Sequence, residues 1–295
     1  MSETAKSATR ELPVGAGRIA RRFEELAERG ELGLVAYLTA GDPTLAASEA
    51  IILAAAEAGA DVIELGVPFS DPMADGPTIQ RASERALRSG TTLAGVLDLA
   101  ARVRAKSDVP LVLFSYFNPI LQAGLEKFAK SAAATGIDGV LVTDMTPEES
   151  AEYRGAMHRN GLDTIFLAAP TSTEARLTLI AEATTGFLYL ISRTGVTGVR
   201  DALPEELPAL VRRARAATRL PIAVGFGISL PTHVSVLGGI ADAAVVGSAL
   251  VARVEKAATK EAAAESVGEL IRSLKRAARA GVSRRDNDLG GGQTT

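Results

Sequence analysis

The chain has 295 residues and a mass of 30.5 kDa, with 47% hydrophobic residues and a formal net charge of −3. This slightly acidic balance offers no basic face to nucleic acid or to an anionic membrane surface. The absence of cysteine excludes disulfides, thiolate metal ligands and a cysteine nucleophile, and no long apolar run free of charges predicts a membrane span.

The first segment of the chain, residues 1–14, is polar and aperiodic and is expected to be disordered. It lacks the apolar core of a signal peptide, which together with the lack of cysteine favours a reducing cytoplasm. Residues 17–30 place Ile19, Phe23 and Leu26 on one face. This spacing predicts an amphipathic helix ahead of the first strand.

Eight apolar runs then alternate with helical segments. The expected strands are 32–40, 61–67, 111–117, 138–145, 163–170, 187–192, 221–228 and 242–251. The expected helices are 45–60, 77–90, 91–107, 125–136, 147–161, 172–184, 204–218, 230–239 and 260–280. Continuous apolar strands in strict alternation with helices indicate a parallel sheet buried on both faces.

Eight such units over about 250 residues favour one closed (β/α)8 TIM barrel with an extra N-terminal helix. A doubly wound open sheet is the alternative that the same alternation allows. We expect a single barrel domain over residues 15–282. Residues 283–295 show no apolar periodicity and are expected to be a disordered tail.

Glu64 is a carboxylate inside an otherwise apolar predicted strand. Burying a charge is costly unless it has a partner or a task. Burial should also raise its pKa, which suits proton transfer near neutral pH. We therefore favour a catalytic acid–base role for Glu64 over a purely structural ion pair.

The loop after this strand holds two more acids, Asp71 and Asp75, and prolines at 68, 72 and 77 that restrict its conformations. In TIM barrels the chemistry lies in loops that follow the carboxyl ends of strands. Aspartate is also a common turn and N-cap residue. The spacing alone leaves a catalytic and a capping role for Asp75 both open.

Three later strands end in glycine-containing motifs, which allow backbone N–H groups to approach an anion closely. They are SRTGVTG with Gly195 and Gly198, GFGIS with Gly225 and Gly227, and VVGSA with Gly247 and Ser248. Each alone could be a simple turn, but three in successive units indicate a phosphate site. The loop 192–200 could be a mobile lid or an ordinary connection.

The residues that are missing from the strands restrict the chemistry. No lysine lies in any expected strand, which disfavours a Schiff-base mechanism. The only histidines, His158 and His233, lie in expected helices, so no metal site is expected. What remains is acid–base chemistry by carboxylates on a phosphorylated ligand.

Several motifs together are similar to those of the tryptophan synthase alpha subunit family, in order over most of residues 32–251. They are LTAGDPT (38–44), DVIELGVPFSDPMADGPTIQRA (61–82), LVLFSYFNPI (111–120), GVLVTDMTPEES (139–150), LISRTGVTG (190–198), VGFGIS (224–229) and VVGSA (245–249). The ELGVPFSDPxADGP pattern is very specific to that family.

The resemblance implies retro-aldol cleavage of indole-3-glycerol phosphate to indole and glyceraldehyde 3-phosphate. Glu64 then occupies the general acid–base position, Asp75 binds the indole N–H, and Tyr189 is the third catalytic residue, near Glu64. The resemblance further implies a phosphate cradle and an indole pocket. Their residues are Gly198, Gly227, Gly247 and Ser248 for the phosphate, and Tyr37, Tyr116 and Phe226 for the indole. Arg193 and Thr197, in the loop 192–200, are the expected lid residues.

The resemblance also implies a partner, a beta subunit in an alpha2-beta2 complex, to which indole passes internally. Pyridoxal phosphate would be bound by that subunit, and no cofactor is expected on this chain. The loop Pro68–Asp75 and the SRTGVTG loop would face the partner. Two other functions stay open: an isomerase acting on another phosphorylated sugar in the same fold, and a barrel that only regulates its partner.

Overall fold

The computed structural model describes residues 17–192, 203–225 and 227–290. Of the residues expected to act, Arg193, Thr197, Gly198 and Phe226 lie outside this part of the chain. Within it, no helix is long and apolar enough to cross a membrane.

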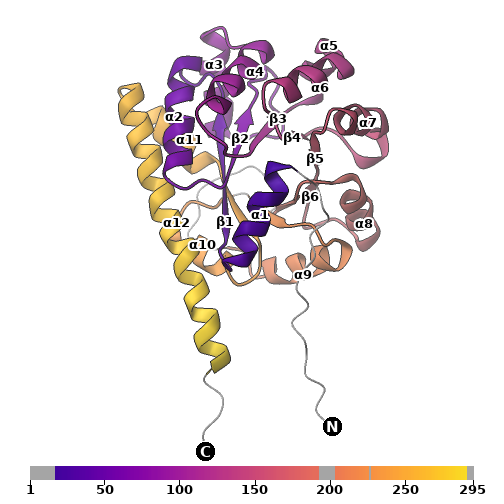
Figure 1. Ribbon diagram of the computed structural model, residues 1–295, viewed down its shortest axis with the longest axis vertical. Helices are drawn as coiled ribbons and strands as arrows, with labels where there is room; N and C mark the ends of the chain where they lie inside the picture. Colours follow the sequence, from indigo (N-terminus) through magenta and orange to yellow (C-terminus); the bar gives the residue numbers. More distant parts are fainter. Residues whose placement is uncertain (1–16, 193–202, 226, 291–295) are drawn as a thin grey trace, which may run out of the picture.

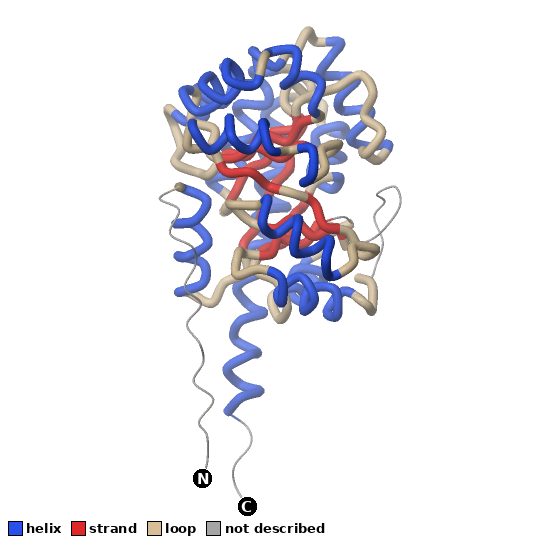
Figure 2. The backbone as a smooth tube through the Cα atoms, turned by 90° about the vertical axis from the view of Figure 1, so that its right-hand side faces the viewer, coloured by secondary structure: helices blue, strands red, loops and turns tan. Residues whose placement is uncertain are grey.

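Nine parallel strands form one sheet within the described residues. They are β1 (Gly33–Thr39), β2 (Val62–Gly66), β3 (Leu111–Ser115), β4 (Gly139–Val142), β5 (Asp163–Ile165), β6 (Leu167–Ala168), β7 (Leu188–Ile191), β8 (Ile222–Gly225) and β9 (Ala243–Val246). Their order is β5-β4-β3-β2-β1-β9-β8-β7-β6. Figure 2 shows these strands at the centre with helices around them.

The two end strands of this order belong to one chain segment, so the sheet closes on itself. β5 pairs with β4 and β6 pairs with β7, and only Phe166 separates them. The Tyr189 N–H donates to the Phe166 carbonyl at 3.2 Å. The TIM barrel prediction is therefore confirmed, with one of its eight strand positions divided at Phe166.

Twelve α-helices and one 3₁₀ turn occur in the described residues. The helices are α1 (Arg18–Glu28), α2 (Leu45–Glu57), α3 (Pro77–Arg88), α4 (Leu93–Arg104), α5 (Phe117–Ala123), α6 (Leu125–Ala134), α7 (Ala151–Arg159), α8 (Glu174–Ala183), α9 (Leu207–Ala217), α10 (Pro231–Leu237), α11 (Ser248–Lys256) and α12 (Lys260–Gly290), and the turn is η1 (Pro147–Glu149).

The structure corrects the sequence analysis at three of these helices. The expected strand 111–117 ends at Ser115 and α5 begins at Phe117, whose N–H donates to Asp144 Oδ1 at 2.7 Å. Asp144 follows the neighbouring strand β4, so the local sequence around Phe117 could not predict this cap. The expected strand 242–251 likewise ends at Val246, and α11 follows. Finally, the expected helix 260–280 is longer in the structure, where α12 runs to Gly290.

The predicted N-terminal helix closes the amino-terminal end of the barrel. The α1 residues Ile19, Phe23 and Leu26 are all buried and belong to the same cluster as the inward-facing strand residues. The rings of Phe23 and Phe187 have centroids 5.7 Å apart. In Figure 1, α1 crosses the centre of the strands. The barrel interior is therefore plugged at one end and can receive a ligand only from the other.

Aspartates recur at the amino-terminal ends of the strands and link neighbouring strands. Each carboxylate accepts a backbone N–H from the adjacent strand at 2.6–2.8 Å: Asp61 from Leu34, Asp138 from Leu111 and Asp242 from Ile222. A basic side chain also contacts each one: Lys275, Arg104 and Arg215 respectively. These carboxylates satisfy strand ends at the face that TIM barrels use for stability.

Candidate active site

Glu64 lies on β2 and points into the barrel, on the same face of the strand as the core residue Val62. It is 0% exposed, and neither carboxylate oxygen has a hydrogen-bond partner among the described residues. Burial raises the pKa of this carboxyl to about 8. The side chain is therefore protonated at neutral pH and can both donate and accept a proton near that pH.

Two tyrosines share the barrel interior with Glu64. Tyr37 on β1 is its register partner, and Tyr189 lies on β7. Burial raises the pKa of both phenols well above their usual range, and the negative charge of Glu64 adds to that effect. Both tyrosines therefore stay neutral, and their hydroxyls can donate hydrogen bonds to a carboxylate or to a ligand.

Two glycines make room for these phenols. A Cβ at Gly66 would lie 2.2 Å from the Tyr37 hydroxyl oxygen, and a Cβ at Gly225 would lie 2.3 Å from that of Tyr189. The rings thus pass over strand positions that must lack a side chain. Gly66 is not among the residues expected from the sequence to act at the site, although a glycine inside a strand is a known sign of close approach.

Asp75 lies in the loop between β2 and α3, and Tyr116 at the end of β3 holds it in place. The Tyr116 hydroxyl donates to Asp75 Oδ2 at 3.2 Å and accepts the Ala74 N–H at 2.9 Å. The Phe69 ring stacks on Tyr116 with centroids 5.0 Å apart. One phenol therefore contacts the loop at three points, a tertiary role that the expected indole pocket did not include.

The capping alternative for Asp75 is not what the structure has. The N-cap of α3 is Gly76, and Pro77 begins the helix. The Asp75 carboxylate is thus free to face the site. Burial raises its pKa to about 6, against the smaller opposing effect of the Tyr116 hydrogen bond. Asp75 is consequently ionised at neutral pH and can accept a hydrogen bond from a ligand N–H.

The described part of the expected phosphate cradle consists of Gly227, Gly247 and Ser248. Gly227 follows β8 and has φ +84°, a conformation that favours glycine. Gly247 is the N-cap of α11, which begins at Ser248. The positive end of a helix dipole and free backbone N–H groups at this position suit an anion.

No cluster of three metal-ligating side chains occurs in the part of the chain that the structure describes.

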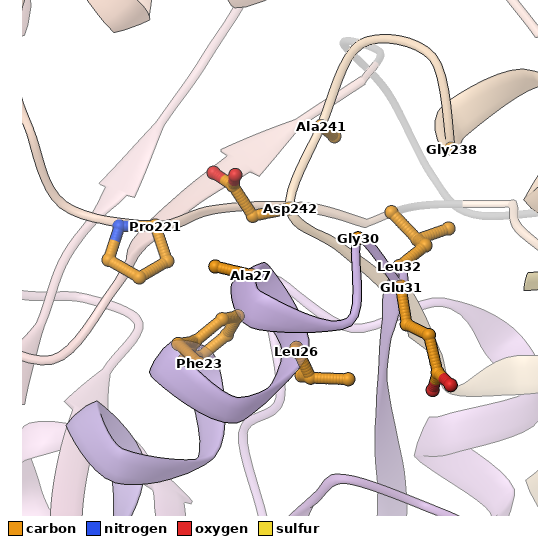
Figure 3. Close-up of a pocket in the computed structure, with 10 residues that line it drawn as sticks. All are labelled: Phe23, Leu26, Ala27, Gly30, Glu31, Leu32, Pro221, Gly238, Ala241 and Asp242. Carbon is orange, nitrogen blue, oxygen red and sulfur yellow. The ribbon is translucent and has the colours of Figure 1, made fainter. Parts of the chain in front are cut away.

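A separate hollow of about 220 Å³ lies at the other end of the barrel (Figure 3). It lies between α1 and the segments that precede β8 and β9. Phe23, Leu26, Glu31, Pro221, Gly238 and Asp242 are among its lining residues. Since catalysis in this fold occurs at the carboxyl ends of the strands, we assign the active site to Glu64 and Asp75 and not to this hollow.

Comparison with known proteins decides the family. The family model described as tryptophan synthase alpha chain matches residues 23–279. The chain belongs to the tryptophan synthase alpha chain family. A tryptophan synthase alpha chain from Solibacter usitatus is 54% identical over 259 residues, 88% of this chain and 97% of the relative. One from Geobacter sp. (strain M21) is 52% identical over 258 residues, 88% of this chain and 96% of the relative.

Solved structures agree with this family assignment. Mycobacterium tuberculosis tryptophan synthase matches with a TM-score of 0.83 and 35% identity, over 89% of this chain and 98% of that one. The tryptophan synthase subunit alpha of Legionella pneumophila str. Paris matches with a TM-score of 0.81 and 36% identity, over 88% and 98%. As a member of this family, the protein is an enzyme subunit of tryptophan biosynthesis.

Proposed function

We propose that the chain catalyses the retro-aldol cleavage of indole-3-glycerol phosphate to indole and glyceraldehyde 3-phosphate. The observation that carries this proposal is Glu64, a fully buried carboxyl without a hydrogen-bond partner among the described residues and with a pKa of about 8. Keeping an unpaired acid inside an apolar barrel destabilises the fold. A catalytic task explains why it is present.

The two carboxyls, Glu64 and Asp75, have different tasks in the reaction. Glu64 protonates the ring carbon of the indole that carries the side chain, and the resulting carboxylate takes the proton of the adjacent side-chain hydroxyl. The carbon–carbon bond then breaks, its electrons return to the ring as indole, and the hydroxyl carbon becomes the aldehyde. Asp75 accepts a hydrogen bond from the indole N–H and so stabilises the ring tautomer formed on protonation. No other reactant is needed, so atoms and charges balance.

The remaining residues bind the two ends of the substrate. Gly247 and Ser248 suit the phosphate because they lie at the N-terminus of α11. Gly227 suits it because a glycine at positive φ lets the backbone approach an anion closely. Tyr37 and Tyr116 suit the flat ring. Tyr189 acts beside Glu64, a position that its charge interaction with Glu64 supports. Gly198 and Phe226 are proposed for the cradle and the pocket by family resemblance alone. Arg193 and Thr197 are proposed for the lid because they belong to the polar, glycine-containing loop 192–200.

Replacing Glu64 by glutamine tests this mechanism. Glutamine keeps the size of the side chain but cannot transfer the proton, so we expect at least a 100-fold loss of indole release. Binding of glyceraldehyde 3-phosphate should be retained, because the phosphate residues are untouched. Indole release would be followed by absorbance and product binding by calorimetry. Turnover near the wild-type rate in Glu64→Gln would rule out the assigned role.

The same variant carries its own folding control. Because the native pKa of Glu64 is raised from 4.5 to about 8, the native chain holds an extra proton between these pH values. Native stability is therefore lost as pH rises through this window. Glu64→Gln should thus melt at a higher temperature than the wild type at pH 8, and by a smaller margin at pH 5. An inactive variant with this pattern is folded.

We further propose that the chain works with a beta subunit in an alpha2-beta2 complex, in the cytoplasm, with pyridoxal phosphate on the partner and no cofactor of its own. Two exposed apolar side chains support a docking surface near the mouth of the barrel. Met73, 90% exposed, precedes Ala74 in the loop that Tyr116 holds, and Leu121, 52% exposed, lies in α5 directly after Tyr116. We also propose that the single barrel domain spans residues 15–282.

A further inference from the structure

His233 is a buried histidine that the proposed chemistry does not use. It lies on α10 and is 2% exposed, and it faces the core together with Val234 and Leu237. The Ser229 N–H donates to its Nδ1 atom at 3.4 Å. Ser229 is two residues after Gly227, in the same loop that follows β8. The imidazole is thus bonded to the backbone of a loop in the proposed phosphate cradle.

This hydrogen bond assigns the two ring nitrogens. Nδ1 is the acceptor, so the N–H of the ring is at Nε2. Nε2 and the nearby Ser229 hydroxyl are both buried and have no hydrogen-bond partner among the described residues. Unpaired buried polar atoms destabilise a fold. A side chain chosen only for packing would not add them.

The helix that carries His233 is held by its neighbours. Helix α10 packs against the long helix α12, so the ring is fixed to the outer layer of the barrel. Gly227, by contrast, has φ +84° and a backbone with few steric restraints of its own. The hydrogen bond to His233 Nδ1 on α10 therefore restrains a loop that the backbone of Gly227 leaves flexible.

We propose that His233 is a positioning residue that holds the Gly227–Ser229 backbone in the conformation that binds the substrate phosphate. This inference rests on the proposed function, because the ligand of the loop is the phosphate of that substrate. His233 itself touches neither the substrate nor the reacting atoms. Its effect is on affinity for the phosphorylated ligand and not on proton transfer.

Two variants of similar size test the role of the acceptor. His233→Leu fills the volume but removes the acceptor, whereas His233→Asn places an amide oxygen near the former Nδ1. We expect His233→Leu to raise KM for indole-3-glycerol phosphate about three- to tenfold with kcat nearly unchanged, the effect of losing one positioning hydrogen bond. His233→Asn should restore most of the affinity. Equal KM values in the two variants and the wild type would overturn the proposal.

Binding of the separate products keeps the test independent of turnover. Glyceraldehyde 3-phosphate should bind more weakly to His233→Leu, and indole should bind equally to all three proteins. A parallel loss of indole binding would overturn a role specific to phosphate. If the wild-type chain releases no indole, the proposed function fails, but these binding measurements still judge the role of His233.

A spectroscopic measurement on the wild-type chain covers the case in which His233→Leu does not fold. The chain has two histidines, and the other, His158, is exposed. In ¹⁵N spectra the Nδ1 of His233 should show the shift of an unprotonated, hydrogen-bonded nitrogen. That shift should move on addition of glyceraldehyde 3-phosphate and not on addition of indole. A protonated Nδ1, or no response to the phosphorylated product, would contradict the inference.

Discussion

Glu64 and Asp75 are carboxyls of one site, but their surroundings leave Glu64 protonated and Asp75 ionised at neutral pH. Glu64 has no polar partner among the described residues and a pKa of about 8, because burial is unopposed. Asp75 is only partly buried, the hydrogen bond from Tyr116 limits the rise, and its pKa is about 6. At neutral pH the first can donate a proton and the second can accept a hydrogen bond, as the proposed reaction requires.

The pH profile of kcat/KM should reflect these two values. Activity should fall below about pH 6, where Asp75 gains a proton, and above about pH 8, where the free chain loses the proton of Glu64. Tyr116→Phe removes the hydrogen bond that lowers the pKa of Asp75, so the acid limb should move to higher pH. The alkaline limb should stay in place. An unchanged acid limb in Tyr116→Phe would show that Asp75 does not govern it.

At the scale of elements, the two ends of the strands have different tasks. The amino-terminal ends are fixed by aspartates, backbone N–H groups and basic side chains. The best buried example joins α12 to β2, where Lys275 Nζ lies 2.6 Å from Asp61 Oδ2 and both side chains are nearly inaccessible. The carboxyl ends carry Glu64, Asp75 and the glycine loops. Stability and chemistry are therefore separated along the barrel axis.

Lys275→Met should lower the free energy of unfolding without affecting catalysis. Removing one member of a buried pair leaves Asp61 insufficiently compensated, at a cost of about 3 kcal/mol. Kinetic constants should not change, because the pair lies at the end opposite Glu64. Lys260→Met is the matched control on the same helix, since Lys260 and its partner Glu261 are largely exposed and such pairs contribute about 0.5 kcal/mol. Denaturant unfolding would compare the two, and equal losses would refute the assignment.

At the scale of the whole molecule, α1 plugs one end of the barrel and leaves the mouth as the route to Glu64. The segments around that mouth include Met73 and Leu121, which expose apolar surface beside the loop that carries Asp75. A partner that docks there would contact this loop directly. Binding of the beta subunit and ordering of Asp75 would then be coupled through Tyr116.

Leu121→Asp should therefore weaken stimulation of indole release by the beta subunit. A charge placed in an apolar contact reduces affinity, and we expect about a tenfold rise in the beta subunit concentration needed for half-maximal stimulation. Leu179→Asp is the control, because Leu179 is similarly exposed but lies on α8 in the outer helical layer. Activity without the partner should be close to the wild type in both. Equal weakening by both variants would argue against docking at α5.

The alternation of apolar and helical segments determined a parallel sheet with helices, favoured the barrel over an open sheet, and predicted the N-terminal helix and the buried position of Glu64, because period and burial are local properties of a sequence. Local pattern could not determine α5, whose cap is the distant Asp144, or where the segment around Phe166 changes its pairing partner. Only the tertiary structure decided that Asp75 caps no helix, that Tyr116 holds it, and that Gly66 makes room for Tyr37. Each of these depends on contacts between residues far apart in the chain, which form only when the strands close into a barrel.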